Sequence, residues 1–279
     1  MSTLTCLSPA KLNLFLHITG RRPDGYHSLQ TAFQLLDWGD TMQFTPRNDN
    51  EIRLSMCKAG ISDNENLIVR AARLLQEILP GETPGADITV EKLIPLGGGL
   101  GGGSSNAATT LLALSHLWGL NIESEKLQSI GAKLGADVPV FVAGYSAWAE
   151  GIGDILTPLT LPSSWYFIIQ PNCHVSTAKI FSHGELTRDT SPIKLAAFFR
   201  GGTRNDCQAI VRNLYPEVDN ALKWLEKFGE AKLTGTGACI FASFETKEEV
   251  DAIRRQLPKK WTGYVARGIN KSPILASLH

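Results

Sequence analysis

The residues best suited to chemistry gather in one stretch, LIPLGGGLGGGSSNAATTLL, at positions 93–112. Six glycines interrupt an otherwise apolar sequence there, and glycine allows backbone angles and close approaches that a Cβ forbids. Positions 87–94 alternate and are rich in β-branched residues, which predicts a strand, and 104–114 indicate a capped helix with an apolar stripe. A strand, a glycine loop and a helix N-terminus in this order direct several backbone N–H groups and the positive end of a helix dipole to one point. The stretch therefore predicts a phosphate site.

Other interpretations of the glycines were weighed. A flexible surface linker would carry Ser, Thr or charged residues in place of the flanking strand and the long Ala/Leu helix. A Walker A loop needs Lys and then Ser or Thr after its last glycine, whereas Gly103 is followed by Ser104. The spacing Gly97 to Gly102 matches G-x-G-x-x-G, but 120–134 indicate a helix and leave no strand for the acidic residue of a dinucleotide fold. Neither familiar phosphate loop explains the stretch.

Two charged residues outside the loop could act on a bound phosphate. Lys11 lies in an alternating, strand-like run at 5–19, on the face opposite Leu12, where a lysine is most often a solvated edge residue. Asp137 comes directly before Val138 and Pro139, a good position for a helix N-cap. From their own surroundings, both residues have a structural interpretation as well as a catalytic one.

Aromatic and hydroxyl side chains flank these positions. Tyr26 and His27 end the polar turn 20–27 before a second strand at 29–36, and a hairpin loop would explain that turn equally well. Thr177 is a natural helix cap and Phe181 is by default a core residue. A second glycine turn at 232–239 precedes a strand at 240–244, and a simple tight turn remains an alternative there.

The remaining elements must position these residues. We expect helices at 63–80, 123–134, 205–213, 216–228 and 248–257, and further strands at 165–170 and 262–268. Positions 151–162 are rich in glycine and proline, which indicates a domain change near residue 160. We therefore expect an N-terminal domain at 1–160 and a C-terminal domain at 161–279.

Composition excludes several classes of protein. The 279 residues are 43% hydrophobic with a formal net charge of zero, which leaves no electrostatic footprint for nucleic acid or an anionic membrane. No apolar run is long enough to span a bilayer, and the N-terminus lacks the layout of a signal peptide. Five widely spaced cysteines without a CxxC pair favour free thiols in a reducing cytoplasm and no metal-ligand cluster.

The loop resembles the phosphate loop of the GHMP kinases, with Pro95 and Gly99-Leu100-Gly101 matching that pattern. Gly102 and Gly103 replace its two serines, and Ser104 and Ser105 follow, a departure typical of the diphosphocytidyl-methylerythritol kinase branch. The segment PAKLNLFLHITGRRPDGYHSLQTAFQ at 9–34 is similar to the opening of that branch and is far more specific than a glycine loop. The resemblance implies an α+β protein with an N-terminal domain like ribosomal protein S5 and a ferredoxin-like C-terminal domain.

The resemblance also implies a role for each candidate residue. Lys11 and Asp137 would be catalytic, and the ATP phosphates would lie on Pro95, Leu96, Gly97, Gly98, Gly99, Leu100, Gly101, Gly102, Gly103, Ser104 and Ser105. The substrate would be bound by Asn13, Tyr26, His27, Thr177 and Phe181, with cytosine between the rings of Tyr26 and Phe181. No residue is identified as a protein ligand of Mg2+.

The implied reaction is transfer of the ATP γ-phosphoryl group, with Mg2+, to a hydroxyl of 4-diphosphocytidyl-2-C-methyl-D-erythritol, giving the 2-phosphate and ADP. Asp137 would accept the hydroxyl proton and Lys11 would offset charge on the phosphoryl group. Two alternatives stay open: a related kinase of a mevalonate- or sugar-type alcohol, and a non-catalytic nucleotide-binding or RNA-binding module. We expect a cytoplasmic monomer or homodimer with no nucleic-acid or membrane partner.

Overall fold

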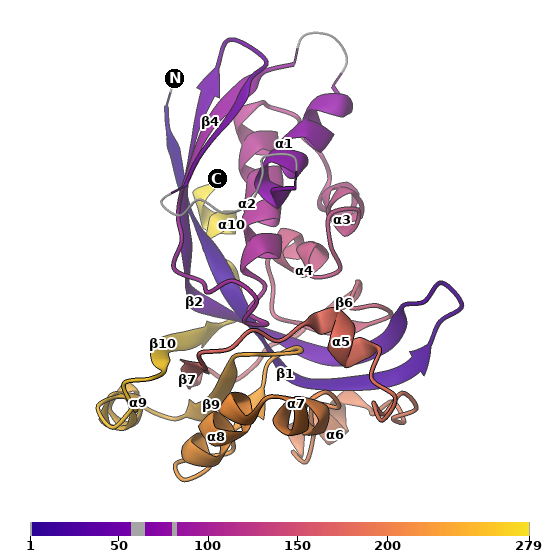
Figure 1. Ribbon diagram of the computed structural model, residues 1–279. Helices are drawn as coiled ribbons and strands as arrows, with labels where there is room; N and C mark the ends of the chain where they lie inside the picture. Colours follow the sequence, from indigo (N-terminus) through magenta and orange to yellow (C-terminus); the bar gives the residue numbers. More distant parts are fainter. Residues whose placement is uncertain (1, 57–64, 80–82, 279) are drawn as a thin grey trace.

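A computed structural model describes residues 2–56, 65–79 and 83–278 (Figure 1). Its strands are β1 (Leu4–Arg21), β2 (His27–Arg47), β3 (Ile52–Met56), β4 (Gly85–Glu91), β5 (Ala147–Glu150), β6 (Ile155–Pro158), β7 (Trp165–Gln170), β8 (Lys232–Leu233), β9 (Ile240–Phe244) and β10 (Thr262–Ile269). Its helices are α1 (Leu67–Glu77), α2 (Gly102–Leu117), α3 (Ser124–Ala132), α4 (Val138–Ala143), α5 (Thr177–Phe181), α6 (Leu195–Phe199), α7 (Gln208–Leu214), α8 (Pro216–Leu225), α9 (Lys247–Arg254) and α10 (Ile274–Ser277).

Within these residues the strands form one ten-stranded sheet whose main path is β3-β4-β2-β10-β7-β9-β8. The long strands β1 and β2 pair antiparallel and run through both halves of the molecule (Figure 1). Only the β3–β4 pair among the described strands is parallel. Together with the helices, this mixed sheet confirms the α+β prediction.

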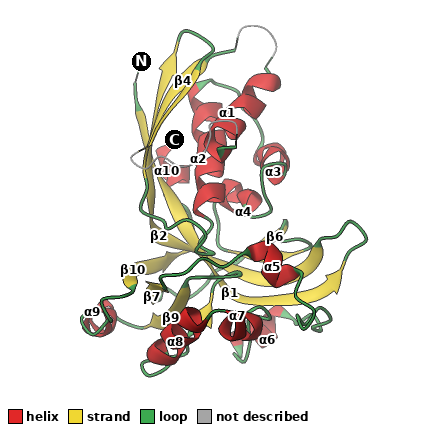
Figure 2. Ribbon diagram, viewed as in Figure 1, coloured by secondary structure: helices red, strands yellow, loops and turns green. Residues whose placement is uncertain are grey.

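Each half of the sheet has its own helices and its own core. Helices α1 to α4 cover one face of the upper half, where Phe44, Leu75 and Leu111 are fully buried (Figure 2). Helices α7 and α8 pack against β7 and β9 in the lower half, around Phe167 and Leu222. The cores do not divide cleanly along the sequence, because α10 returns to the first core and part of β1 lies in the second. The boundary near residue 160 stays a prediction.

The pairing of β1 with β2 is irregular beside the residues of chemical interest. The register shifts between Pro9 and Lys11 and again between Asn13 and Leu16. Irregularities of this kind break the simple alternation of a strand and redirect side chains. Lys11 is consequently only 2% exposed, and the interpretation of this residue as a solvated edge lysine is wrong.

Three local predictions require correction. Helix α2 begins at Gly102 with Gly101 as its N-cap, and no side chain caps it, so the Ser104–Asn106 segment lies inside the first turns. The helix is also buried at every position from 105 to 115, because it runs through the middle of the helical layer, and therefore has no single apolar stripe. Strand β4 ends at Glu91, three residues early, where Lys92 turns into a buried polar network.

Other predictions are confirmed with small shifts. Strands β7 and β9 have the predicted bounds, and β10 extends the predicted strand by one residue. Helix α1 is shorter than predicted, and its amide N–H at Ile68 bonds to the side chain of the N-cap Asn66, while positions 63–64 and 80 lie outside the described residues. Cys6, Cys173, Cys207 and Cys239 are free, and Cys57 falls outside that part.

Candidate active site

The glycine loop follows β4 and leads directly into α2. Gly97, Gly99 and Gly101 have φ of +67°, +75° and +73°, the left-handed region that favours glycine. A Cβ at position 99 would lie 2.2 Å from the carbonyl oxygen of Thr234, and one at 101 would lie 2.8 Å from the Phe141 ring. At these two positions the loop conformation and the close neighbours both require glycine.

The loop leaves the N-terminus of α2 without a capping side chain. The first N–H groups of a helix need partners from outside it, and an anion can supply them. The side chains of the two serines diverge. Ser104 lines the cavity that contains Lys11 and Asp137, whereas Ser105 is buried and accepts a hydrogen bond of 2.8 Å from Ser8. Of the two predicted hydroxyls, Ser104 is the one that faces the cavity.

The second glycine turn lies directly behind the first. Thr234 Oγ1 donates to the carbonyl of Gly99 at 3.2 Å, and the backbone N–H of Cys239 donates to the carbonyl of Gly98 at 3.2 Å. Thr234 Oγ1 also accepts the backbone N–H of Asn13 at 3.0 Å. The turn at 232–239 therefore supports the glycine loop and ties it to β1, which goes beyond a simple tight turn.

A buried polar network fixes the other end of the loop. Both oxygens of the fully buried Asp40 are occupied: Oδ1 accepts the backbone N–H groups of Leu93 and Ile94, each at 2.8 Å. Its Oδ2 accepts Lys92 Nζ and, at 2.9 Å, Asn106 Nδ2. Pairing and hydrogen bonding of this kind are what allow a carboxylate to be buried. The network joins β2, the loop and α2.

Lys11 and Asp137 meet in the wall of the cavity. Lys11 Nζ lies 3.2 Å from Asp137 Oδ2, 2.6 Å from Asn13 Oδ1 and 3.1 Å from the carbonyl of Gly99. An ammonium group has three donors, and these three acceptors account for all of them. Asp137 occupies the N-cap position of α4, yet its side chain makes no capping hydrogen bond and remains 33% exposed. The geometry thus favours the interaction with Lys11 over the capping interpretation.

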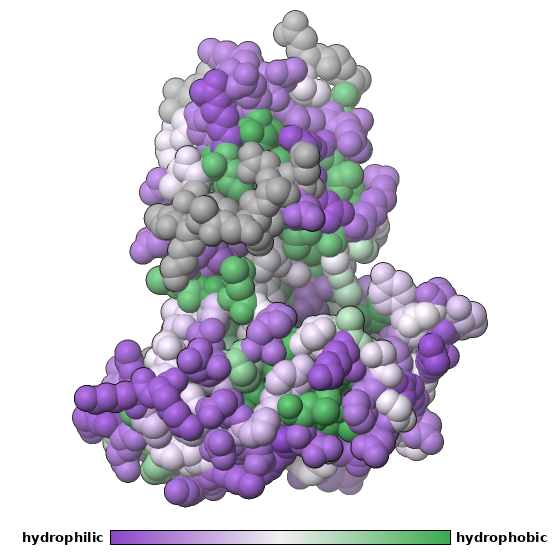
Figure 3. Space-filling model, viewed as in Figure 1, coloured by the Kyte–Doolittle hydropathy of each residue, from purple (hydrophilic) through white to green (hydrophobic). Residues whose placement is uncertain are grey.

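Two adjoining cavities lie beside this pair. The first, of about 330 Å³, is lined by Lys11, Asp137, Ser104 and the glycine turns. The second, of about 460 Å³, is more apolar and is lined by Tyr26, His27 and Phe181. Leu29, Ala136, Ile152, Thr177 and Phe181 line both. In the space-filling view the molecule narrows where its two halves meet, with apolar side chains at the surface there (Figure 3).

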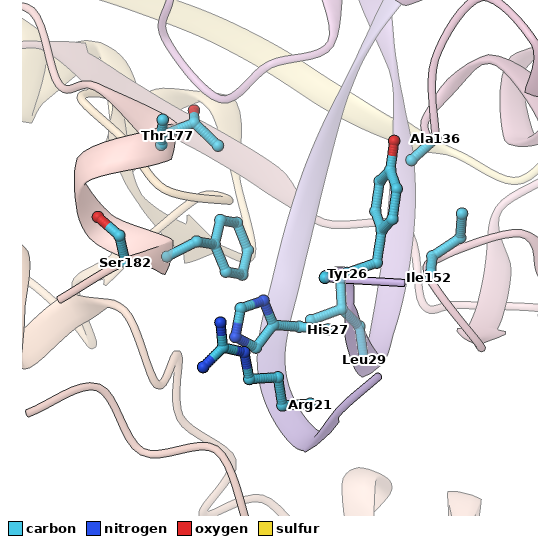
Figure 4. Close-up of a pocket in the computed structure, with 11 residues that line it drawn as sticks. Arg21, Tyr26, His27, Leu29, Ala136, Ile152, Thr177 and Ser182 are labelled. Carbon is cyan, nitrogen blue, oxygen red and sulfur yellow. The ribbon is translucent and has the colours of Figure 1, made fainter. Parts of the chain in front are cut away.

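The aromatic residues of the second cavity are arranged differently from a simple pair. Phe181 stacks on His27, with ring centroids 5.1 Å apart and an interplanar angle of 29°. The Tyr26 side chain is 60% exposed, and its ring stands across the cavity from Thr177 (Figure 4). Burial lowers the pKa of His27, and the nearby positive charges of Arg188 and Arg21 lower it further. The predicted sandwich between Tyr26 and Phe181 stays a prediction, with His27 as a third ring on the Phe181 side.

Several residues at the site were not expected from the sequence. Thr236 Oγ1 lies 2.8 Å from Thr177 Oγ1 and joins the second glycine turn to α5. Arg188 hydrogen bonds to His27, and Asp40 and Lys92 hold the loop. These contacts join residues far apart in sequence, so local patterns gave no signal for them. Only Thr236 had one, because it lies within the recognised glycine turn.

The comparisons with known proteins agree with this geometry. The GHMP kinases N terminal domain matches residues 66–145, and the GHMP kinases C terminal domain matches residues 186–263. The chain belongs to the GHMP kinase family, whose members are ATP-dependent kinases of small molecules. Within the described residues no helix is long and apolar enough to cross a membrane.

The relatives with the strongest similarity carry one name, 4-diphosphocytidyl-2-C-methyl-D-erythritol kinase. The protein from Hahella chejuensis is 54% identical over 286 residues, covering 99% of this chain and 97% of the relative. The one from Pseudomonas syringae pv. syringae is 56% identical over 276 residues, covering 98% of each. A crystal structure of 4-(cytidine 5'-diphospho)-2C-methyl-D-erythritol kinase has a TM-score of 0.82 at 30% identity, covering 95% of this chain and 99% of that one. Mevalonate kinase from Methanococcus jannaschii, at 17% identity and a TM-score of 0.71, shares the fold.

Proposed function

We propose that this chain transfers the γ-phosphoryl group of ATP to 4-diphosphocytidyl-2-C-methyl-D-erythritol and releases the 2-phosphate and ADP. The proposal draws the substrate from relatives that are more than half identical over almost the whole chain. The observation that carries it is the contact of 3.2 Å between Lys11 and Asp137, made in the same cavity as the glycine loop. A kinase of an alcohol needs an anion site, a cation and a carboxylate near the acceptor hydroxyl, and this cavity brings the three together.

The anion site would be the backbone of the glycine loop and the first turn of α2. Its N–H groups would bind the ATP phosphates, and the helix dipole would add to the attraction. Ser104 would contribute a hydroxyl, while Pro95, Leu96 and Leu100 would contribute through the shape of the loop. Because the loop is held from behind by Thr234 and from β2 by Asp40, its donors are arranged before the nucleotide arrives.

Asp137 would act on the acceptor hydroxyl. Its carboxylate faces the cavity, accepts the proton of the hydroxyl and directs the oxygen towards the phosphoryl group. Lys11 lies behind it and would place a positive charge beside the group in transfer. Asn13 holds the ammonium group at 2.6 Å and so fixes its position.

Mg2+ would accompany ATP. This cation prefers oxygen ligands and usually keeps several waters and phosphate oxygens, with only one or two protein carboxylates. Among the described residues there is no cluster of three or more His, Cys, Asp and Glu side chains that could hold a metal by themselves. The oxygen donors of Asp137 and Ser104 in the cavity fit a shared site completed by the phosphates. Bound there, Mg2+ would neutralise phosphate charge.

The cytidyl end of the substrate would occupy the second cavity. The exposed Tyr26 ring offers a face on which a base can stack, and His27 and Phe181 form the opposite side. Thr177 lies on the wall shared by the two cavities, where the diphosphate and the alcohol would pass from one to the other. The distance between the base and the reacting hydroxyl thus matches the arrangement of two joined cavities.

The test is ADP release from ATP and Mg2+ in the presence and absence of the purified cytidyl alcohol. We expect release that depends on this substrate, with the phosphate found on its 2-hydroxyl by 31P NMR. Release with mevalonate or a sugar alcohol, and none with the cytidyl compound, would support a different GHMP kinase. Nucleotide binding without release for any alcohol would favour a non-catalytic module.

A further inference from the structure

Arg188 is fixed by its own side of the fold. Its guanidinium Nη2 donates to the carbonyls of Phe181 at 2.8 Å and His183 at 2.7 Å, and Nη1 donates to the carbonyl of Leu186 at 3.0 Å. Its Nε–H donates to Nε2 of His27 at 3.1 Å. Four of the five N–H groups of the guanidinium therefore have partners, which leaves its plane and direction little freedom.

This contact determines which nitrogen of His27 carries the proton. Arginine stays protonated and has no acceptor atom, so it can bond to Nε2 only when that nitrogen presents its lone pair. A neutral imidazole must then carry its hydrogen on Nδ1. The pKa of His27 is lowered by burial and by the charges of Arg188 and Arg21, which agrees with a neutral ring.

The orientation of the ring is fixed as well. Stacking on Phe181 sets its plane, and the bond to Arg188 sets its rotation within that plane. One ring nitrogen faces the open part of the cavity between Thr177 and Tyr26, while the other points away from it (Figure 4). Among the residues that the structure describes, Nδ1 has no protein partner. An N–H donor is thus presented to whatever base lies on Tyr26.

We propose that Arg188 is a positioning residue that holds His27 as an Nδ1–H donor and thereby makes the base subsite select cytosine over uracil. The proposal rests on the proposed function, which places the cytidyl group in this cavity. The Watson–Crick edge of cytosine offers an acceptor at N3, whereas N3 of uracil carries a hydrogen. A donor facing N3–H leaves both groups without a partner, and a site built for one hydrogen bond rejects the analogue that cannot make it.

The first experiment uses the unaltered protein. 15N NMR of histidine-labelled protein reports which imidazole nitrogen carries the proton, and the His27→Gln variant assigns the signal. We expect the Nδ1–H form near neutral pH, with calorimetry showing CDP bound about tenfold or more tightly than UDP. An Nε2–H ring, or equal affinity for the two nucleotides, overturns the proposal.

The second experiment releases the ring. In Arg188→Met the imidazole can move its proton to Nε2 and accept the N3–H of uracil, so the preference for CDP over UDP should fall about tenfold. Arg188→Lys keeps a donor near Nε2 and should restore part of the preference. Arg200→Met, an exposed arginine at the end of α6, is the matched control and should retain the full preference.

Turnover separates this proposal from the proposed function. In Arg188→Met the KM for the cytidyl alcohol should rise while kcat at saturating substrate stays within a few-fold. A folded Arg188→Met protein that discriminates as the unaltered protein does refutes the role of Arg188. Absence of phosphoryl transfer in the unaltered protein refutes the proposed function instead, and the nucleotide binding and the NMR signal are still measured. If the Met variant fails to fold, the NMR result on the unaltered protein decides.

Discussion

The ammonium group of Lys11 lies 3.2 Å from the carboxylate of Asp137, and this contact takes the place of the capping bond that an aspartate before a helix usually makes. Lys11 comes from an irregular part of β1 and Asp137 from the start of α4, so the sheet and the helical layer together create the pair. A carboxylate that is not used as a cap can orient a substrate. The first two predictions follow from this pair.

Asp137→Asn should retain ATP binding and lose turnover. The amide keeps the shape of the side chain but accepts a proton poorly, and loss of a general base costs about 10²–10⁴-fold in rate. Steady-state kinetics with calorimetry of ATP binding provide the measurement. Asp251→Asn, on the exposed face of α9, is the control and should behave as the unaltered enzyme. Turnover near normal in Asp137→Asn would remove this residue from its role.

Lys11→Met should lower kcat, and its effect should not add to that of Asp137→Asn. Methionine keeps the length of the chain but removes the charge shared among Asp137, Asn13 and the Gly99 carbonyl. Residues that act as one unit lose most of their effect when the first is removed. A double-mutant cycle on kcat/KM measures the coupling. Fully additive losses would mean that the two side chains act separately.

Gly99→Ala should weaken ATP binding and lower stability, because the new methyl group would meet the Thr234 carbonyl at 2.2 Å in a residue with positive φ. Strain of this kind costs about 1–3 kcal/mol. Thermal unfolding and the KM for ATP measure the two effects. Gly184→Ala is the matched control, since a Cβ there meets nothing within 4 Å. A Gly99→Ala enzyme with an unchanged KM for ATP would show that the loop need not adopt this conformation.

The sequence predicted those parts of the fold that depend on local patterns. Strands β7 and β9 were found with their bounds because short apolar runs bounded by turn residues mark them clearly. The start of α2 was misplaced because Ser104 and Ser105 are good caps locally, whereas the loop uses Gly101 in a left-handed conformation and leaves the helix end free. The signal for a cap was real, but the contacts around the loop outweighed it.

The site was predictable in its members and only partly in its geometry. Alternation alone places Lys11 at a solvated position, and burial of its ammonium group depends on Asn13, Gly99 and Asp137, which come from three different segments. Resemblance to a family brought Lys11 and Asp137 together before the fold was known. Arg188 and Asp40 act through long-range hydrogen bonds, and no spacing within the chain predicts such bonds.

Stability should fall as the pH is lowered from about 7 towards 5. The pKa of His17 is lowered, first by burial and also by Arg204, although Asp206 opposes the shift. An unfolded chain, with an ordinary histidine pKa near about 6.5, then binds more protons than the folded one, so the free energy of unfolding declines as pH falls through this window. His17→Phe should flatten the decline in urea unfolding at several pH values. An equally steep decline in the variant would assign it to other groups.

Tyr26→Ala should raise the KM for the cytidyl substrate far more than the KM for ATP. The ring is exposed beside the second cavity and distant from the glycine loop in function, so its loss should remove base stacking and leave nucleotide phosphate binding intact. Stacking of a base on an aromatic ring contributes about 1–3 kcal/mol, or roughly 5- to 150-fold in affinity. Tyr26→Phe keeps the ring and should stay close to the unaltered enzyme, which separates stacking from any role of the hydroxyl. Equal increases in both KM values for Tyr26→Ala would refute stacking, and a large loss in Tyr26→Phe would transfer the role to the hydroxyl group.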